Sequence, residues 1–257
     1  MRTQRAPIFF PVTLVLIGVV ILLNNFLLIN ADIVSLWPLL LILIGLQVIW
    51  RGDLAPGWEA HTFGITRGSV ESATLEVNSA EIDVRVQSLQ RAGRLIAGQY
   101  TARSRPKLTV RNNRASLVMR RGNTWLFSLA DWELGLAQDV PWAILMSAHL
   151  GAFQVDLRGL LINQAAIATG FGDIRLITPD RECGSLYVNS TFGDIQLAVP
   201  RGIPAVVHVK ASTLCRVMAR GYQVDASGVY YATSGEKPLV TAMVSATFGN
   251  IQLSIVD

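Results

Sequence analysis

The 257-residue chain has few residues that bind metals or form disulfides: it contains two cysteines and three histidines. Cys183 and Cys215 lie far apart and form no Cys-x-x-Cys pair, and the histidines are scattered. Metal sites need several such ligands at short, regular spacing. The sequence therefore predicts no metal site and no cofactor. Both thiols are expected to be reduced if this part of the chain is cytoplasmic, and a disulfide stays open if it faces outward.

The chain also lacks the short motifs that mark common catalytic sites. It has no Gly-x-Ser-x-Gly elbow, no phosphate-binding P-loop, no Gly-x-Gly-x-x-Gly turn after a strand and no His-Glu-x-x-His helix. Acids such as Glu133, Asp139 and Asp156 have no partner that spacing alone identifies as an acid–base pair. The sequence predicts a protein that is not an enzyme.

Beyond residue 50 the sequence has no long segment with the 3.6-residue periodicity of an amphipathic helix. Short runs rich in Val, Ile, Leu and Thr alternate there with turn residues, which is typical of an all-β domain. Roughly 200 residues of this kind are enough for one sizeable hydrophobic core.

One heptapeptide recurs with small changes: Gly-Phe-Gly-Asp-Ile-Arg-Leu at 170–176, Thr-Phe-Gly-Asp-Ile-Gln-Leu at 191–197 and Thr-Phe-Gly-Asn-Ile-Gln-Leu at 247–253. A period of roughly 20 residues fits a stack of β units with two short strands and two turns each. Ile174 and Leu176 are expected to face the core, and each phenylalanine is expected to fill the interior and stack on the next copy. The glycine permits a positive φ or a close backbone approach. A structural role is predicted for Phe171, Gly172, Asp173, Phe192, Gly193, Asp194, Phe248, Gly249 and Asn250.

Looser copies extend this series. Phe153 begins one of them, Leu214 and Cys215 replace the Phe and the Gly in another, and residues 79–84 form a candidate early copy. Calcium binding is the functional alternative for Gly-Asp repeats, but such arrays need denser Gly-Gly-x-Gly-x-Asp tandems. The wide spacing favours a structural ladder.

Two apolar segments near the N-terminus, 7–29 and 33–50, are long enough to cross a bilayer and contain no charged residue. A helix of about 18–23 residues covers roughly 27–35 Å, close to the thickness of a bilayer core. The short connection at 30–32 predicts a tight transmembrane α-helical hairpin. A cleaved signal peptide is the alternative for the first segment, but a second apolar segment follows at once.

The charges around this hairpin predict its orientation. Arg2 and Arg5 precede the first segment, and Arg51 follows the second. The positive-inside rule then places both termini and the β domain in the cytoplasm. The expected organisation is a hairpin at 1–51, a linker at 52–70 and a β-solenoid-like domain at 71–257.

Residues 91–121 are rich in Arg and Lys and contain no Asp or Glu. Tethered to an anionic inner leaflet, such a segment could touch lipid. The alternative is the solvated face of a β-hairpin, with Leu108, Val110, Leu117 and Met119 facing inward. Nucleic-acid binding is not expected, because Tyr100 is the only aromatic residue there and no stacking platform exists. The candidate lipid contacts are Arg103, Arg105, Lys107, Arg111 and Arg114.

Residues 35–50 read Ser-Leu-Trp-Pro-Leu-Leu-Leu-Ile-Leu-Ile-Gly-Leu-Gln-Val-Ile-Trp, and Leu-Leu-Asn-Asn stands at 22–25. These residues resemble the transmembrane region shared by LiaI- and LiaF-type bacterial proteins. The resemblance covers about residues 7–51. It implies a protein with two spans in the bacterial cytoplasmic membrane.

Residues 132–200 resemble the toast-rack β domain of LiaF-like and adhesin-like families. The resemblance is carried by Trp-Glu-Leu-Gly-Leu at 132–136, Asp-Val-Pro at 139–141, Leu-Gly-Ala-Phe at 150–153 and Thr-Gly-Phe-Gly-Asp at 169–173. The chain departs from the family pattern at Gln154, Ser190-Thr191 and Cys215. The resemblance implies a membrane-anchored, β-solenoid-like toast-rack stack, and some such relatives regulate two-component signalling during cell-envelope stress.

Two functions stay open on this basis. The first is a non-catalytic scaffold or regulator with its β domain at the inner membrane face. Its partner would be a sensor kinase, another membrane protein or a second copy of the chain. The second is an adhesin-like or self-assembling surface protein with the β domain outside.

Overall fold

The structure, a computed structural model, describes residues 60–101, 104–121, 131–233 and 237–256. The predicted membrane hairpin and Arg103 lie outside these residues. Among the described residues, no helix has the length and hydropathy that a membrane crossing requires.

The described residues form eighteen strands, which confirms the prediction of an all-β domain. The strands are β1 (Ala60–Thr66), β2 (Ser72–Ala80), β3 (Asp83–Leu89), β4 (Arg94–Thr101), β5 (Lys107–Arg111), β6 (Arg114–Arg120), β7 (Asp131–Ala137), β8 (Pro141–Ala148), β9 (Phe153–Asp156), β10 (Leu161–Phe171), β11 (Ile174–Ile177), β12 (Ser185–Phe192), β13 (Ile195–Pro200), β14 (Ala205–Ala211), β15 (Cys215–Ala219), β16 (Gln223–Val224), β17 (Val229–Tyr231) and β18 (Val240–Val256).

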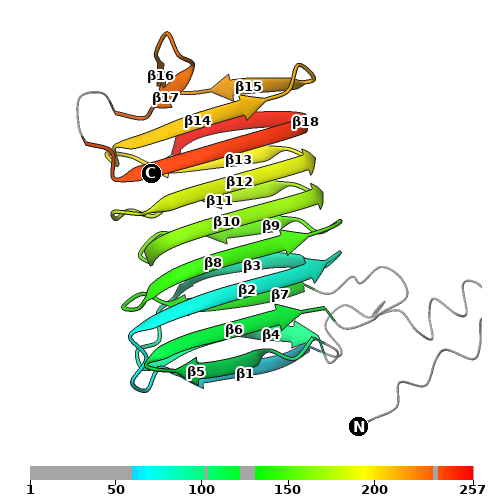
Figure 1. The fold of residues 1–257 in the computed structure, drawn as a ribbon, viewed down its shortest axis with the longest axis vertical. Coiled ribbons are helices and arrows are strands. Elements are labelled where there is room, and N and C mark those ends of the chain that lie inside the picture. Colours follow the sequence, from blue (N-terminus) through cyan, green and yellow to red (C-terminus); the bar gives the residue numbers. More distant parts are fainter. Residues whose placement is uncertain (1–59, 102–103, 122–130, 234–236, 257) are drawn as a thin grey trace, which may run out of the picture. The chain divides into compact units, whose positions relative to one another are not determined.

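These strands make two ladders, and β18 takes part in both. Figure 1 shows the strands of each ladder following one another along the long axis of the domain. The β1 sheet runs β1-β4-β7-β3-β9-β11-β13-β18-β15. The β5 sheet runs β5-β6-β2-β8-β10-β12-β18-β14-β17-β16. The pairings from β6 to β14 and from β7 to β15 are all parallel. Among the described residues, antiparallel pairings occur only near the ends of the ladders: β1–β4, β4–β7, β5–β6, β14–β17 and β16–β17.

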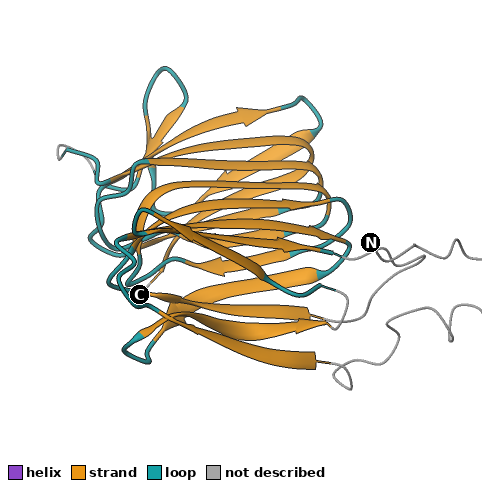
Figure 2. Cartoon of the chain, turned by 60° about the horizontal axis from the view of Figure 1, so that its bottom comes forward, coloured by secondary structure: helices purple, strands orange, loops and turns teal. Residues whose placement is uncertain are grey.

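Each central rung consists of one strand from each sheet, joined by a sharp corner. The chain passes from β10 to β11 and from β12 to β13 at such corners, and β18 runs through its corner without a break. Figure 2 shows the strands of the two sheets following one another through these bends. The central rungs thus bend at one common edge of the β-solenoid-like stack, and the repeated motif lies at this edge in the β10–β11, β12–β13 and β18 rungs.

The rungs do not stack in chain order. The rung of β2 and β3 lies between those of β6–β7 and β8–β9, because β2 pairs with both β6 and β8. The rung made by β18 lies between β12–β13 and β14–β15. Strands from distant parts of the sequence are therefore neighbours, so the stack is tied together by long-range pairing.

The core fills the space between the two sheets, because alternate residues of each strand point inward. In β2 and β8 this alternation is regular, and Leu75, Val77 and Ile144 are buried. Trp132, Trp142 and Phe153 are the largest fully buried side chains. Burying a large apolar side chain stabilises the fold by about 1.5–3 kcal/mol. The Trp142 Nε1–H also donates to the Ala137 carbonyl at 2.9 Å, which satisfies the indole.

Two details at the β1 and β5 end differ from the sequence-based expectations. Strand β1 occupies part of the predicted linker at 52–70, because Phe63 and Ile65 alternate toward the core and the strand pairs with β4. The hairpin of β5 and β6 is confirmed, but Leu108 and Val110 are exposed rather than covered. Both belong to β5, which among the described residues has a strand on one side only.

Candidate functional site: corners and outer faces of the rungs

The glycine of the repeated motif is required by the close approach of neighbouring corners. Gly172, Gly193 and Gly249 have φ values of +150°, +144° and +117°. A Cβ atom on Gly193 would lie 2.1 Å from the carbonyl oxygen of Gly172, and one on Gly249 would lie 2.3 Å from that of Gly193. Only glycine lets the backbones pack at this distance.

The acid of the motif binds the backbone of the next rung. The Asp194 N–H donates to Asp173 Oδ1 at 2.9 Å, and the Asn250 N–H donates to Asp194 Oδ1 at 2.7 Å. Asp83 makes the same contact between β3 and β9, accepting from the Ala152 N–H at 2.8 Å. These carboxylates complete the backbone hydrogen bonding of a corner, which is the structural role that the spacing favours over calcium binding.

Asp194 allows a test of this role. Asp194→Ala is expected to lower the free energy of unfolding by about 1–3 kcal/mol, because the Asn250 N–H loses its acceptor. Asp194→Asn keeps an oxygen acceptor and is expected to cost under about 1 kcal/mol. Urea unfolding followed by circular dichroism measures both variants. Equal losses would show that the negative charge, rather than the acceptor, is what the corner needs.

The phenylalanines of the motif stack as predicted but do not fill the interior. The ring centroids of Phe171 and Phe192 are 4.6 Å apart, those of Phe192 and Phe248 are 4.5 Å apart, and the ring planes of both pairs are nearly parallel. Their side chains nevertheless lie outside: Phe171 is 52% exposed, Phe192 38% and Phe248 37%. The chain bends from one sheet into the other directly after each ring, and this turns the ring out of the core.

The looser copies occupy different registers. Cys215 pairs with Gly249, as its place in the copy predicts. Phe153, in contrast, pairs with Ile174 rather than with Phe171, and it is fully buried. The prediction that Phe153 is a copy of the repeated phenylalanine is therefore wrong, and Leu150 stands in that place.

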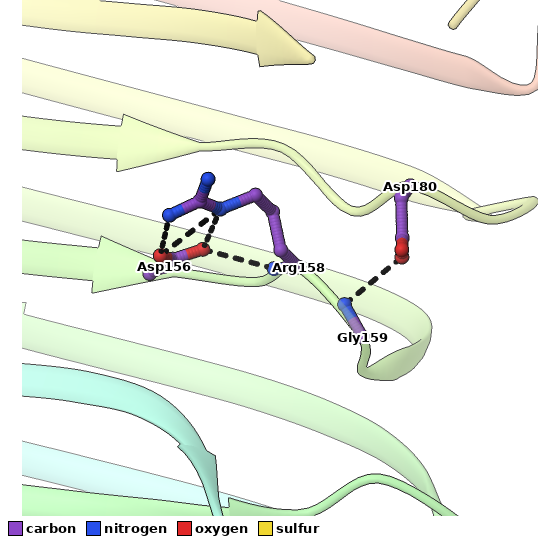
Figure 3. A network of polar contacts seen from close by, with 4 residues as sticks. All are labelled: Asp156, Arg158, Gly159 and Asp180. Carbon is purple, nitrogen blue, oxygen red and sulfur yellow. Dashed lines mark hydrogen bonds and ion pairs between the residues drawn. The ribbon is translucent and has the colours of Figure 1, made fainter. Parts of the chain in front are cut away.

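At the opposite edge of the rungs, polar contacts again link neighbouring turns (Figure 3). The Gly159 N–H donates to Asp180 Oδ1 at 2.9 Å, across two successive turns. Arg158 forms an ion pair with Asp156 at 2.7 Å. Partial burial alone would raise the pKa of Asp156, but the hydrogen bonds from Arg158 outweigh it and hold that pKa below its ordinary value of 3.8.

This lowered pKa predicts a small acid-dependent loss of stability. Asp156 contributes stability above its unfolded-state pKa, and this contribution disappears as the pH falls through the lower folded-state value. Asp156→Asn is therefore expected to lose less stability than the wild type when the pH is lowered through this range. Urea unfolding of the two proteins over a series of acid pH values measures the difference, and parallel curves would contradict it.

The basic segment is only partly brought together. Lys107, Arg111 and Arg114 lie on the β5–β6 hairpin and Arg105 precedes it, and all four are exposed. Elsewhere in the segment, Arg120 pairs with Glu76 at 2.7 Å. The hairpin thus carries exposed cations, and alternation along β5 places Lys107 and Arg111 on the face opposite to Leu108 and Val110.

Both cysteines are free thiols. Cys183 is buried, and desolvation raises its pKa to about 11. Cys215 is half-buried, and its Sγ lies 3.4 Å from the Ala246 carbonyl. The thiolate form of Cys183 is scarce at neutral pH, so this residue is unreactive.

Sequence reasoning missed a shallow groove of about 480 Å³ on the outer face of the β1 sheet. The strand register places Gly64, Ala97 and Gly135 side by side as its floor. Gln99, Glu133 and Arg94 are among the residues that line it. The signal for this groove is the alignment of small residues across strands, which becomes visible only when the register is known.

Among the described residues, no group of three or more His, Cys, Asp or Glu side chains is placed to hold a metal ion. The candidate site is therefore the set of exposed surfaces around the rungs, above all the corner with its row of phenylalanines.

Comparison with known proteins agrees with this architecture. Residues 8–49 match the LiaI-LiaF-like transmembrane region, and residues 61–197 match the N-terminal domain of toast_rack. The first match indicates a membrane-anchored protein. A search of curated proteins finds no match.

Among solved structures, a candidate cell adhesion protein from Clostridium sporogenes aligns with a TM-score of 0.68 at 16% identity, covering 77% of this chain and 99% of that chain. At this identity the likeness shows the fold alone. A candidate adhesin from Bacteroides fragilis covers 77% of this chain and 98% of its own at 10% identity, with a TM-score of 0.30, too low to establish a shared fold. Because the toast_rack match covers more than half of the sequence, the chain belongs to the toast-rack family and joins that β domain to a LiaI-LiaF-like transmembrane region.

Proposed function

We propose that this protein is a non-catalytic, membrane-anchored scaffold or regulator of the LiaF type. The observation that carries the proposal is the use of the repeated residues. The glycines and carboxylates of the motif are occupied in holding rungs together, whereas the outer faces and the corner remain exposed. A rigid stack of this kind presents long surfaces to a partner.

The partner in this proposal is a sensor kinase or another membrane protein, and the signal is cell-envelope stress. The resemblance to LiaF-type proteins supports this choice. Deleting residues 1–50 is expected to abolish co-purification of the partner, because the β domain is no longer held at the membrane. Unchanged envelope-stress signalling in a clean deletion strain would rule out the regulatory role.

The β domain lies in the cytoplasm in this proposal, as the positive-inside rule predicts from Arg2, Arg5 and Arg51. Cys183 is a poor probe of topology because it is buried. A better probe is Thr109→Cys in a chain without Cys183 and Cys215, since Thr109 is exposed on β5. A membrane-impermeant maleimide is expected to label it only after permeabilisation, and labelling in intact cells would place the domain outside.

An adhesin-like surface protein is the second candidate function. The shared fold with the Clostridium sporogenes structure favours it. It requires the β domain to lie outside the cell, so the same labelling experiment separates the two proposals. A reporter fused after Asp257 gives an independent reading of the side.

The exposed cations of the β5–β6 hairpin support a contact with anionic lipid in either case. Lys107, Arg111 and Arg114 would meet the headgroups. An environment-sensitive dye on Thr109→Cys, in the full chain reconstituted into vesicles, is expected to shift to the blue only with anionic lipid. Substituting the three cations by glutamine should remove the shift, and a shift that survives would reject the contact.

A further inference from the structure

The phenylalanine row is part of a longer apolar ridge at the corner of the stack. Leu214 directly precedes Cys215, which pairs with Gly249, so it lies at the same corner as Phe248, in a turn that has one residue more than the facing segment of β18. Counting back from the Phe153–Ile174 pair places Leu150 beside Phe171. Both leucines are exposed. In spatial order this corner ridge consists of Leu150, Phe171, Phe192, Phe248 and Leu214.

The neighbours of these side chains along the sequence are mostly small, so the side chains stand out from the surface. Glycines follow Leu150 and each phenylalanine of the ridge, and threonines precede Phe192, Phe248 and Leu214. No large neighbour along the chain therefore covers the rings. At the end beyond Leu150 the row stops at Glu81, which counting back from the Val84–Phe153 pair places beside Leu150 and which forms an ion pair with Arg121. The apolar surface thus has a defined length of five rungs, roughly 19 Å at the usual strand spacing.

The size of the ridge excludes a strong isolated dimer but fits a weak one. A phenylalanine carries roughly 150–250 Å² of surface, so the exposed fractions of the five side chains leave roughly 400–500 Å² of apolar area. Two such ridges together would bury roughly 800–1,000 Å², below the 1,200–2,000 Å² of most stable complexes. Tethering both copies to one membrane raises their effective concentration, which lowers the affinity that pairing requires.

We propose that the corner ridge is a homotypic docking surface through which two membrane-tethered copies of this chain pair. The rings repeat every 4.5–4.6 Å along the ridge. An identical ridge has the same repeat, so the exposed edges of the rings of two copies can pack against one another in register along the whole row. The inference rests on the membrane-anchored scaffold proposed above, but not on the side of the membrane or on a kinase.

A lipid surface is the weaker occupant for this ridge. Asp173 and Asp194 lie two residues beyond Phe171 and Phe192 and would meet the headgroups whenever the rings entered an anionic bilayer. Their carboxylates are also committed to backbone N–H groups of the next corner.

Phe192 is the centre of the ridge, so a two-fold axis relating two fully overlapping ridges brings Phe192 against Phe192. The test is disulfide cross-linking of Phe192→Cys in the full chain carrying Cys183→Ala and Cys215→Ala, reconstituted into vesicles without any other protein. The matched control is Tyr187→Cys, an exposed aromatic residue of the same strand that lies on the outer wall rather than in the ridge. Under mild oxidation, Phe192→Cys is expected to give at least about tenfold more disulfide-linked dimer than the control.

Two further measurements fix the arrangement and keep the test decisive. The first measurement uses a mixture of Phe171→Cys and Phe248→Cys chains. If the two ridges run antiparallel, the disulfide joins one chain of each variant; if they run parallel, it joins two chains of the same variant. Either result supports pairing. Equal cross-linking of Phe192→Cys and Tyr187→Cys, in chains whose circular dichroism is unchanged, would overturn the proposal. A blue shift of a dye at Phe192→Cys that persists at one chain per vesicle would instead assign the ridge to lipid. Because no kinase is present, failure here leaves the proposed signalling role untouched.

Discussion

Gly193→Ala is expected to lower the free energy of unfolding of the β domain by about 2–5 kcal/mol, because the new methyl group both strains the backbone and clashes with the next rung. The φ of Gly193 is +144°, and a Cβ there would lie 2.1 Å from the carbonyl oxygen of Gly172. That oxygen belongs to the backbone of a packed corner and cannot move aside cheaply. Urea unfolding of the full chain in detergent, followed by circular dichroism, measures the loss.

Gly202 provides the matched control for this prediction. Its φ is also positive, at +82°, but no atom lies within 4 Å of the position that a Cβ would take. Gly202→Ala is therefore expected to cost only the backbone strain, about 1–2 kcal/mol. If both substitutions cost the same, the close approach of the corners contributes nothing, and the repeated glycine would be explained by backbone conformation alone.

Phe153→Ala is expected to be the second strongly destabilising substitution, with a loss of about 3–5 kcal/mol from removing a fully buried aromatic side chain. Phe171→Ala removes a ring that is half exposed and stacked on one neighbour, and it is expected to cost only about 1–2 kcal/mol. The same unfolding measurement compares the two. A larger loss for Phe171→Ala would show that the ring row, rather than the interior, holds the rungs together.

The contrast between these phenylalanines explains what could be predicted from the sequence. Alternation correctly predicted that Ile174 and Leu176 face the core, since both are buried. The same alternation in β12 buries Leu186, Val188 and Ser190 and would place Phe192 inside as well. The corner at Gly193 interrupts the strand geometry, so the parity rule fails at the last residue before the bend.

The order of the rungs could not be predicted for a different reason. The repeat gives the length of a rung and the residues of its corner, but each rung offers nearly the same edge to its neighbours. Nothing in the local pattern of β2 and β3 indicates that they pair between β6–β7 and β8–β9. The groove floored by Gly64, Ala97 and Gly135 was missed for the same reason, because it depends on which strands become neighbours.

The position of β18 has a consequence for how the protein is made. Strands β12 to β15 leave the ribosome before β18, yet β12 and β14 do not pair with each other and are joined only through β18. During synthesis the edges of β12 and β13 stay open until residues 240–256 emerge and insert between the two rungs. Unpaired strand edges are prone to association with other chains. Completion of the stack is therefore a late event in biosynthesis, and nascent chains stalled before β18 are the species most in need of a chaperone.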